Sequence, residues 1–212
     1  MTDVLIPKRD GGSDYNLRLV DKTTYHAPVS VVVFEDVLVD EQTNALKTID
    51  TVHHEVHEGE MWHTGHTVAS VANGNSMDLL FHSGGAYDCH MTFEVFAGGQ
   101  VSVYLYEAPT VAAEGDGTPL VIYNMKRSHV GASHSQAYHT PTISATGTTA
   151  LVNGRILPGG TSAQTRVGGG IRQGVEWILN PGTNYLLRTT NTSGSAIAVN
   201  VGLEWYEEEV VV

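Results

Sequence analysis

Five histidines interleaved with carboxylates form the part of this chain best equipped for chemistry. They are His53, His54, His57, His63 and His66, within the stretch HHEVHEGEMWHTGH. Imidazole and carboxylate groups at such spacings are suited to a divalent transition metal. The candidate ligands for such a site are His53, His57, His63 and His66.

Known metal signatures nevertheless fail to match this stretch. The helical zinc signature His-Glu-x-x-His is absent, because the run from His54 to His57 is one residue too short. Cupin enzymes carry two histidines one residue apart, and no His-x-His pair occurs anywhere in this chain. We therefore interpret the histidines as surface and interface residues, with Met61 and Trp62 packing inward. We predict no metal and no cofactor, and a cupin-like metal enzyme remains the less favoured alternative.

Other reactive residue types give weaker signals. Cys89, the single cysteine, alternates with apolar residues, which predicts a buried and unreactive thiol and excludes an intramolecular disulfide. The carboxylates of residues 207 to 209 are interpreted as solvated charge. No serine lies in a nucleophile-elbow sequence. These patterns favour a protein without enzymatic activity.

Composition excludes further classes. The 212 residues carry a formal net charge of -12, which argues against a partner bound through nucleic-acid phosphates. No stretch of eighteen consecutive apolar residues occurs, and the first fifteen residues do not resemble a signal peptide. We therefore expect no membrane partner and synthesis in a host cytoplasm.

The elements that must position these residues are short β-strands. From Ser195 onward every second residue is apolar through Trp205, which is typical of a half-buried strand. A second strand is predicted over 184–190, and the Asn-Thr-Ser-Gly connection at 191–194 predicts an antiparallel hairpin between them. A third, shorter strand is predicted over 176–179.

Short segments of alternating or β-branched residues recur through the rest of the chain. Further strands are predicted over 29–39, 66–72, 77–82, 90–96, 101–106, 120–125 and 138–144. Residues 97–100 predict a hairpin between two of them. Residues 45–57 fit either a short helix or a strand, and we favour the strand. We therefore predict an all-β, antiparallel two-sheet β-sandwich of the jelly-roll type over 51–212. Residues 1–50 are expected to form an extended arm and a first strand.

Several motifs add a resemblance to a known family. They are Val56–Gly59, Gly117–Leu120, Tyr123–Arg127, Glu176–Leu179, Asn184–Arg188 and Leu203–Glu207. In these residues the chain resembles the head decoration, or cement, proteins of tailed bacteriophages. The resemblance covers roughly residues 50 to 207. It implies a jelly-roll domain, usually trimeric, that sits on the capsid exterior and bridges major capsid proteins.

The expected function is therefore a non-enzymatic virion structural protein that stabilises a phage capsid. Its expected partners are the major capsid protein and two further copies of itself. The arm is expected to supply apolar contacts through Val4, Leu5, Ile6, Tyr15, Leu17 and Leu19. A receptor- or glycan-binding phage tail or fibre module remains an alternative, with Trp62, Tyr104 and Tyr106 as the sugar platforms.

Overall fold

A computed structural model describes residues 4–5, 16–17, 51–112, 116–159, 169–172 and 176–209 of the chain. Its contacts divide the chain into two units, Met1–Thr48 and Ile49–Val212. In the first unit, β1 (Val4–Leu5) pairs antiparallel with β2 (Asn16–Leu17). The strand predicted over residues 29–39 lies outside the described residues.

The described part of the second unit begins with a helix, and the strand favoured over residues 45–57 is wrong for residues 51–57, which are helical. Helix α1 (Thr51–Glu58) places Val52 and Val56 one turn apart, and Val56 is half-buried. The amide groups of Gly59 and Glu60 both donate to the Glu55 carbonyl at 3.0 Å. Gly59 has a φ of 92°, a conformation that ends helices and favours glycine. The spacing of four between apolar residues therefore outweighed the alternation that also fitted a strand.

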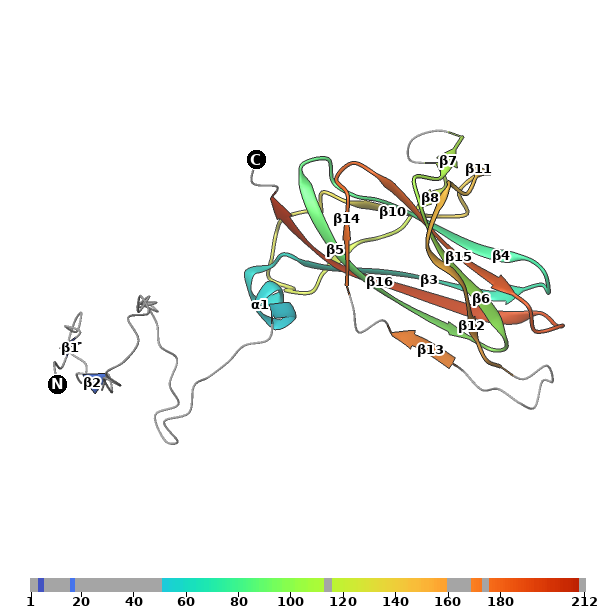
Figure 1. Ribbon diagram of the computed structural model, residues 1–212, viewed down its shortest axis with the longest axis horizontal. Helices are drawn as coiled ribbons and strands as arrows, with labels where there is room; N and C mark the ends of the chain where they lie inside the picture. Colours follow the sequence, from blue (N-terminus) through green and yellow to red (C-terminus); the bar gives the residue numbers. More distant parts are fainter. Residues whose placement is uncertain are drawn as a thin grey trace, which may run out of the picture. The chain divides into compact units, whose positions relative to one another are not determined.

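Strands make up most of the described remainder of the unit and form two large antiparallel sheets (Figure 1). The first sheet runs β13 (Gly169–Arg172), β5 (Tyr87–Ala97), β16 (Ile197–Glu209), β3 (Met61–Val71) and β9 (Tyr123–Asn124), with β14 (Trp177–Leu179) also on β5. The second sheet runs β12 (Thr149–Leu157), β6 (Val101–Glu107), β15 (Asn184–Asn191), β4 (Ser76–His82), β10 (Gln136–His139) and β8 (Thr118–Pro119). The short strands β7 (Thr110–Val111) and β11 (Ile143–Ala145) pair with each other. The predicted all-β, two-sheet sandwich is confirmed.

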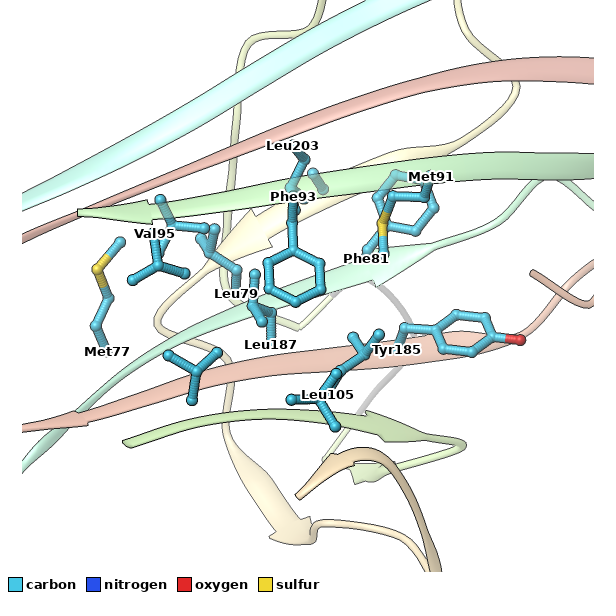
Figure 2. Packing of buried hydrophobic residues seen from close by; sticks show 14 of the residues in the cluster. Met77, Leu79, Phe81, Met91, Phe93, Val95, Leu105, Tyr185, Leu187 and Leu203 are labelled. Carbon is cyan, nitrogen blue, oxygen red and sulfur yellow. The ribbon is translucent and has the colours of Figure 1, made fainter. Parts of the chain in front are cut away.

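The core fills the space between the two sheets. Figure 2 shows Phe93 and Leu203 of the first sheet near Leu79, Leu105 and Leu187 of the second. The alternation predicted for the last strand is confirmed, because Ile197, Val199, Val201, Leu203 and Trp205 are all buried. Truncating one such leucine to alanine costs about 2 to 5 kcal/mol, so this layer holds the two sheets together.

Both predicted hairpins are wrong, because in each case the chain crosses from one sheet to the other. β5 and β6 belong to different sheets, and so do β15 and β16. The two connections lie side by side: the Gly98 amide donates to the Ala198 carbonyl at 2.9 Å, and the Thr192 amide donates to the Gln100 carbonyl at 3.0 Å. A side chain at Gly99 would place its Cβ 2.8 Å from the Cβ of Ser193. The glycine-rich turn signals therefore mark a close approach of two crossings.

A buried asparagine fixes the second crossing. The Asn191 side-chain amide donates to the carbonyls of Val71 and Ser195, both at 2.7 Å. Its side-chain oxygen accepts from the Ser193 amide at 2.9 Å. These bonds tie the start of the crossing to β3, a strand of the opposite sheet.

The same arrangement repeats through the sandwich. The sandwich contains pairs of strands that follow one another in the sequence and lie in opposite sheets. From one side of the sandwich to the other, the pairs lie in the same order in both sheets: β3 with β4, β16 with β15, β5 with β6, and β13 with β12. The last pair in the sequence therefore occupies the middle of both sheets. β16 lies between β5 and β3, and β15 lies between β6 and β4.

Some predicted boundaries need correction. The strand predicted over residues 66–72 begins earlier, at Met61. Only Tyr123–Asn124 of the strand predicted over 120–125 is regular, and this pair forms β9 at the edge of the first sheet. The strand predicted over 138–144 is broken between β10 and β11, where Thr140 has a φ of 52° and Pro141 follows.

Candidate functional site

An apolar strip lies on the surface around β9. Four large hydrophobic side chains within ten residues are exposed: Val121 by 64%, Tyr123 by 51%, Met125 by 41% and Val130 by 101%. They make up half of the large hydrophobic residues that are exposed in the part of the chain that the structure describes. We call residues 121–130 the attachment strip. Several large apolar side chains exposed within one short segment are typical of a surface that meets another molecule.

Hydrogen bonds to β3 and to the turn after α1 hold the attachment strip in place. The Thr64 hydroxyl donates to the Val121 carbonyl at 2.8 Å, and the Met125 amide donates to the Met61 carbonyl at 2.9 Å. Asn124 is buried and its side chain donates to the Gly59 carbonyl. Because Asn124 is anchored inward, its neighbours Tyr123 and Met125 point to solvent.

The strip also carries two of the eleven basic side chains of an acidic protein. The Lys126 ammonium donates to the His57 carbonyl at 2.6 Å. The Arg127 guanidinium lies over the Tyr123 ring, 5.6 Å from its centroid, and donates to the Asn124 carbonyl. These contacts fix the cations beside the exposed apolar side chains, so the strip is suited to a partner surface that is both apolar and acidic.

A cavity of about 470 Å³ adjoins the strip. Trp62, Tyr123, Arg127, His129 and Gln136 are among the residues that line it. The rings of Trp62 and His129 meet edge to face, with centroids 5.7 Å apart. Met61 and Trp62 are both only 4% exposed, as predicted, so Trp62 is not available as the exposed sugar platform of the glycan hypothesis.

The four candidate metal ligands are distributed over separate places. His53 and His57 lie together on α1, with their Nε2 atoms 3.0 Å apart. His66 instead stacks on His139, a residue of β10, with ring centroids 4.0 Å apart. His63 lies opposite Glu204 in the β3–β16 ladder. Among the described residues, no group of three or more histidine, cysteine or acidic side chains is placed to hold a metal ion.

His66 and His139 connect the two sheets at their margin. Burial and the nearby His139 lower the pKa of His66. Asp78 and Thr140 line a second cavity with His66, of about 310 Å³. The Asp78 carboxylate is already bound by Arg188, at 2.6 and 2.8 Å.

Sequence reasoning missed a buried carboxylate. Glu207 is only 5% exposed, so its interpretation as solvated charge is wrong. It accepts hydrogen bonds from the Ser133 hydroxyl (2.7 Å), the amides of His134 (2.9 Å) and Ser135 (2.8 Å), and the Trp205 indole (3.1 Å). Burial alone would raise the pKa of Glu207, but these hydrogen bonds outweigh it and lower that pKa. The alternation that buries Trp205 also buries Glu207, two residues further along β16, and this was the available signal.

Cys89 lies opposite Glu207 in the β5–β16 ladder and is fully buried. Burial and the neighbouring carboxylate raise the pKa of the Cys89 thiol far above its ordinary value. Since the thiolate is the reactive form, the predicted unreactive thiol agrees with this environment.

A second polar cluster that the sequence did not reveal lies where β5 begins and β16 ends. The Tyr206 hydroxyl lies 2.9 Å from Nδ1 of His90 and 3.2 Å from both carboxylate oxygens of Glu176. The His90 and Tyr206 rings stack with centroids 4.4 Å apart. Burial, followed by the neighbouring Glu176, raises the pKa of Tyr206. The neutral phenol is therefore the stable form, and it ties residue 176 to the sheet.

The two tyrosines of the glycan hypothesis are side by side. The rings of Tyr104 and Tyr106 are nearly parallel, with centroids 5.6 Å apart and an angle of 4° between them. Both are partly exposed on β6. Arg188 pairs with Tyr104 across the β15–β6 ladder, so a charged group lies beside the rings.

The predicted arm contacts fall partly within the described residues. Val4 and Leu5 form β1, and Leu17 belongs to β2. Ile6, Tyr15 and Leu19 lie outside the described residues.

Comparisons with known proteins give no relative for this chain. No protein-family model, no curated protein and no solved structure matches it. In the ranges that the structure describes, none of the helices combines the length and apolar character needed to cross a bilayer.

Proposed function

We propose that this chain is a non-enzymatic virion structural protein that decorates a tailed-phage capsid and bridges its major capsid proteins, acting as a homotrimer on the capsid exterior. The observation that carries the proposal is the attachment strip, an exposed apolar and basic segment on a stiff two-sheet sandwich. The resemblance of residues 123–127 to decoration proteins falls within this strip.

The strand order supports the proposal. We infer that the unit is a jelly roll, because its strand pairs follow one another in the same order in both sheets, as in a ribbon of two strands wound into two Greek keys. Jelly rolls recur in viral capsid proteins and in lectins. Such a frame is rigid, since each strand is fixed both by its ladder and by the facing sheet.

The chemistry of the strip determines what binds it. Tyr123 and Met125 are about half exposed, so burying the rest of either side chain against a neighbour contributes about 1 kcal/mol. Solvent-exposed ion pairs from Lys126 and Arg127 add only about 0 to 1 kcal/mol each, and they favour an acidic partner surface. Three copies around an axis would multiply these modest contacts into durable attachment.

The arm supplies the second set of contacts in this proposal. Val4, Leu5, Ile6, Tyr15, Leu17 and Leu19 are apolar residues in a polar segment. Deleting residues 1–24 is expected to leave a folded sandwich that no longer binds capsids. Retained binding of the deleted protein in a particle pull-down would contradict this role.

The strip is tested by sedimenting capsids of the virus with full-length variants. Val121→Ser combined with Met125→Ser is expected to lower capsid binding at least tenfold, because two apolar contacts are lost. Ile156→Ser combined with Ile178→Ser is the matched control, since these side chains are 61% and 63% exposed elsewhere. Equal binding by the two double variants would contradict the proposal, provided that circular dichroism shows both to be folded.

A glycan-binding phage tail or fibre module is the second candidate. The parallel, partly exposed rings of Tyr104 and Tyr106 favour it, because sugars stack on such faces. A glycan array in which the wild type binds and Tyr104→Ala does not would support this function. Equal signals from both proteins would contradict it.

A further inference from the structure

Two histidines on the exposed face of α1 are arranged as a chelating pair. His53 and His57 are four residues apart, so they lie on the same face of the helix one turn apart. Their Nε2 atoms are 3.0 Å apart, and their rings meet edge to face at 71°. Both side chains are exposed. The pair is therefore accessible to an ion from solution without any movement of the fold.

The separation of the two nitrogens favours particular metals. Imidazole nitrogens bind first-row divalent metals at about 2.0 to 2.1 Å. Two nitrogens 3.0 Å apart that each lie at that distance from one ion subtend an angle of about 90° at the metal. This angle matches neighbouring positions of a square-planar or octahedral ion, as preferred by Cu²⁺ and Ni²⁺, better than the wider tetrahedral angle of Zn²⁺.

The surroundings of the pair favour a cation. Glu55 and Glu58 lie on the same helix, and Glu55 is in contact with His54. Lys126 also contacts this helix, and its ammonium binds the His57 carbonyl rather than the ring. Histidine is also suited chemically, because a neutral imidazole nitrogen is a good ligand for Cu²⁺ and Ni²⁺.

We propose that His53 and His57 form a two-nitrogen site for Cu²⁺ or Ni²⁺, with water in the remaining positions of the ion. In the metal-free pair one Nε2 carries the hydrogen and the other accepts it. Metal binding needs both Nε2 lone pairs, so that hydrogen moves to Nδ1 of the same ring. The net charge of the two rings does not change. This site does not depend on the proposed attachment to capsids.

The site is tested on the untagged full-length chain by titration with CuCl₂ while the histidine ring signals are followed by nuclear magnetic resonance. Paramagnetic Cu²⁺ is expected to broaden the signals of His53 and His57 at the lowest metal concentrations, before those of the other nine histidines. Broadening that begins at other histidines, with the α1 pair unaffected, would overturn the proposal.

Variants separate the pair from other histidines. His53→Ala and His57→Ala are each expected to weaken Ni²⁺ binding measured by calorimetry at least tenfold, since even losing a residue that only supports a ligand costs tenfold or more. His54→Ala is the matched control, because it removes a histidine from the same helix and should change affinity less than twofold. Equal affinities for all three variants would overturn the proposal.

Metal competition provides an independent measurement. Ca²⁺, which prefers oxygen ligands, should not displace Cu²⁺ from the two imidazoles. Displacement of Cu²⁺ by Ca²⁺ would contradict a two-imidazole site.

Discussion

Replacing Glu207 by glutamine tests the buried carboxylate that holds residues 133–135 against β16. One carboxylate oxygen accepts three donors, from Ser133, Ser135 and Trp205, and the other accepts the His134 amide. In Glu207→Gln the amide oxygen can keep the first three donors. The new NH₂ group then faces the His134 amide, so two donors oppose each other.

The magnitude follows from these four bonds. A hydrogen bond to a charged group contributes about 1.5 to 3 kcal/mol, and a buried polar group left without a partner costs about 1 to 3 kcal/mol. Losing one such bond and weakening the other three predicts that Glu207→Gln lowers the free energy of unfolding by about 2 to 4 kcal/mol. Glu207→Ala leaves several donors without an acceptor and should cost at least as much. Urea denaturation followed by tryptophan fluorescence measures both values.

The pH dependence provides a second test of the same residue. The folded-state pKa of Glu207 lies below its unfolded value, so the fold favours the charged form. The stabilisation is therefore fully present above the unfolded pKa of about 4.3 and is lost as pH falls through the folded pKa. The difference between wild type and Glu207→Gln should shrink below about pH 4.3.

Glu209→Gln, an exposed carboxylate on the same strand, is the matched control and should change stability by less than about 0.5 kcal/mol. If Glu207→Gln behaves like Glu209→Gln at neutral pH, the carboxylate does not hold the loop and the reasoning is refuted.

Three further outcomes are expected. Asn191→Ala should lower the free energy of unfolding by about 2 to 4 kcal/mol in urea denaturation, because three buried hydrogen bonds are lost at the crossing; a change below about 0.5 kcal/mol would contradict the role of this side chain. Folding lowers the pKa of His66, so the unfolded state binds more protons and the stability should fall as pH drops through about 6.5. In thermal melts, His66→Phe should lose part of this pH dependence. A pH profile equal to that of the wild type would contradict the role of His66. Native Cys89 should react with a thiol reagent only as fast as the protein unfolds, and rapid labelling of the native chain would contradict its burial.

The sequence predicted strands well wherever alternation was clear, and the sandwich followed from them. Val199 to Trp205 illustrate this, since every inward residue of that segment is buried. Alternation does not reveal which strand pairs with which, because the same pattern occurs in a hairpin and in a chain that crosses between sheets. The short polar turns at 97–100 and 191–194 therefore predicted two hairpins where the chain changes sheet.

The candidate site was predictable only in part. The exposed side chains of Val121 and Met125 are ordinary apolar residues in the sequence, and their exposure depends on the buried Asn124 between Tyr123 and Met125. The spacing of His53 and His57 became informative only once α1 was known to be a helix. Contacts such as His66 with His139 join residues more than seventy positions apart, and no local pattern reports such contacts.

The central position of β15 and β16 has a consequence for how the protein is made. Before residues 184–209 leave the ribosome, β4 and β6 lack the strand that joins them, and so do β3 and β5. Until β15 and β16 have been made, neither sheet can close, and the facing edges of β3, β4, β5 and β6 stay unpaired. Because contacts so distant in sequence must form together, folding should be slow, and those edges are open to aggregation until the last pair of strands inserts.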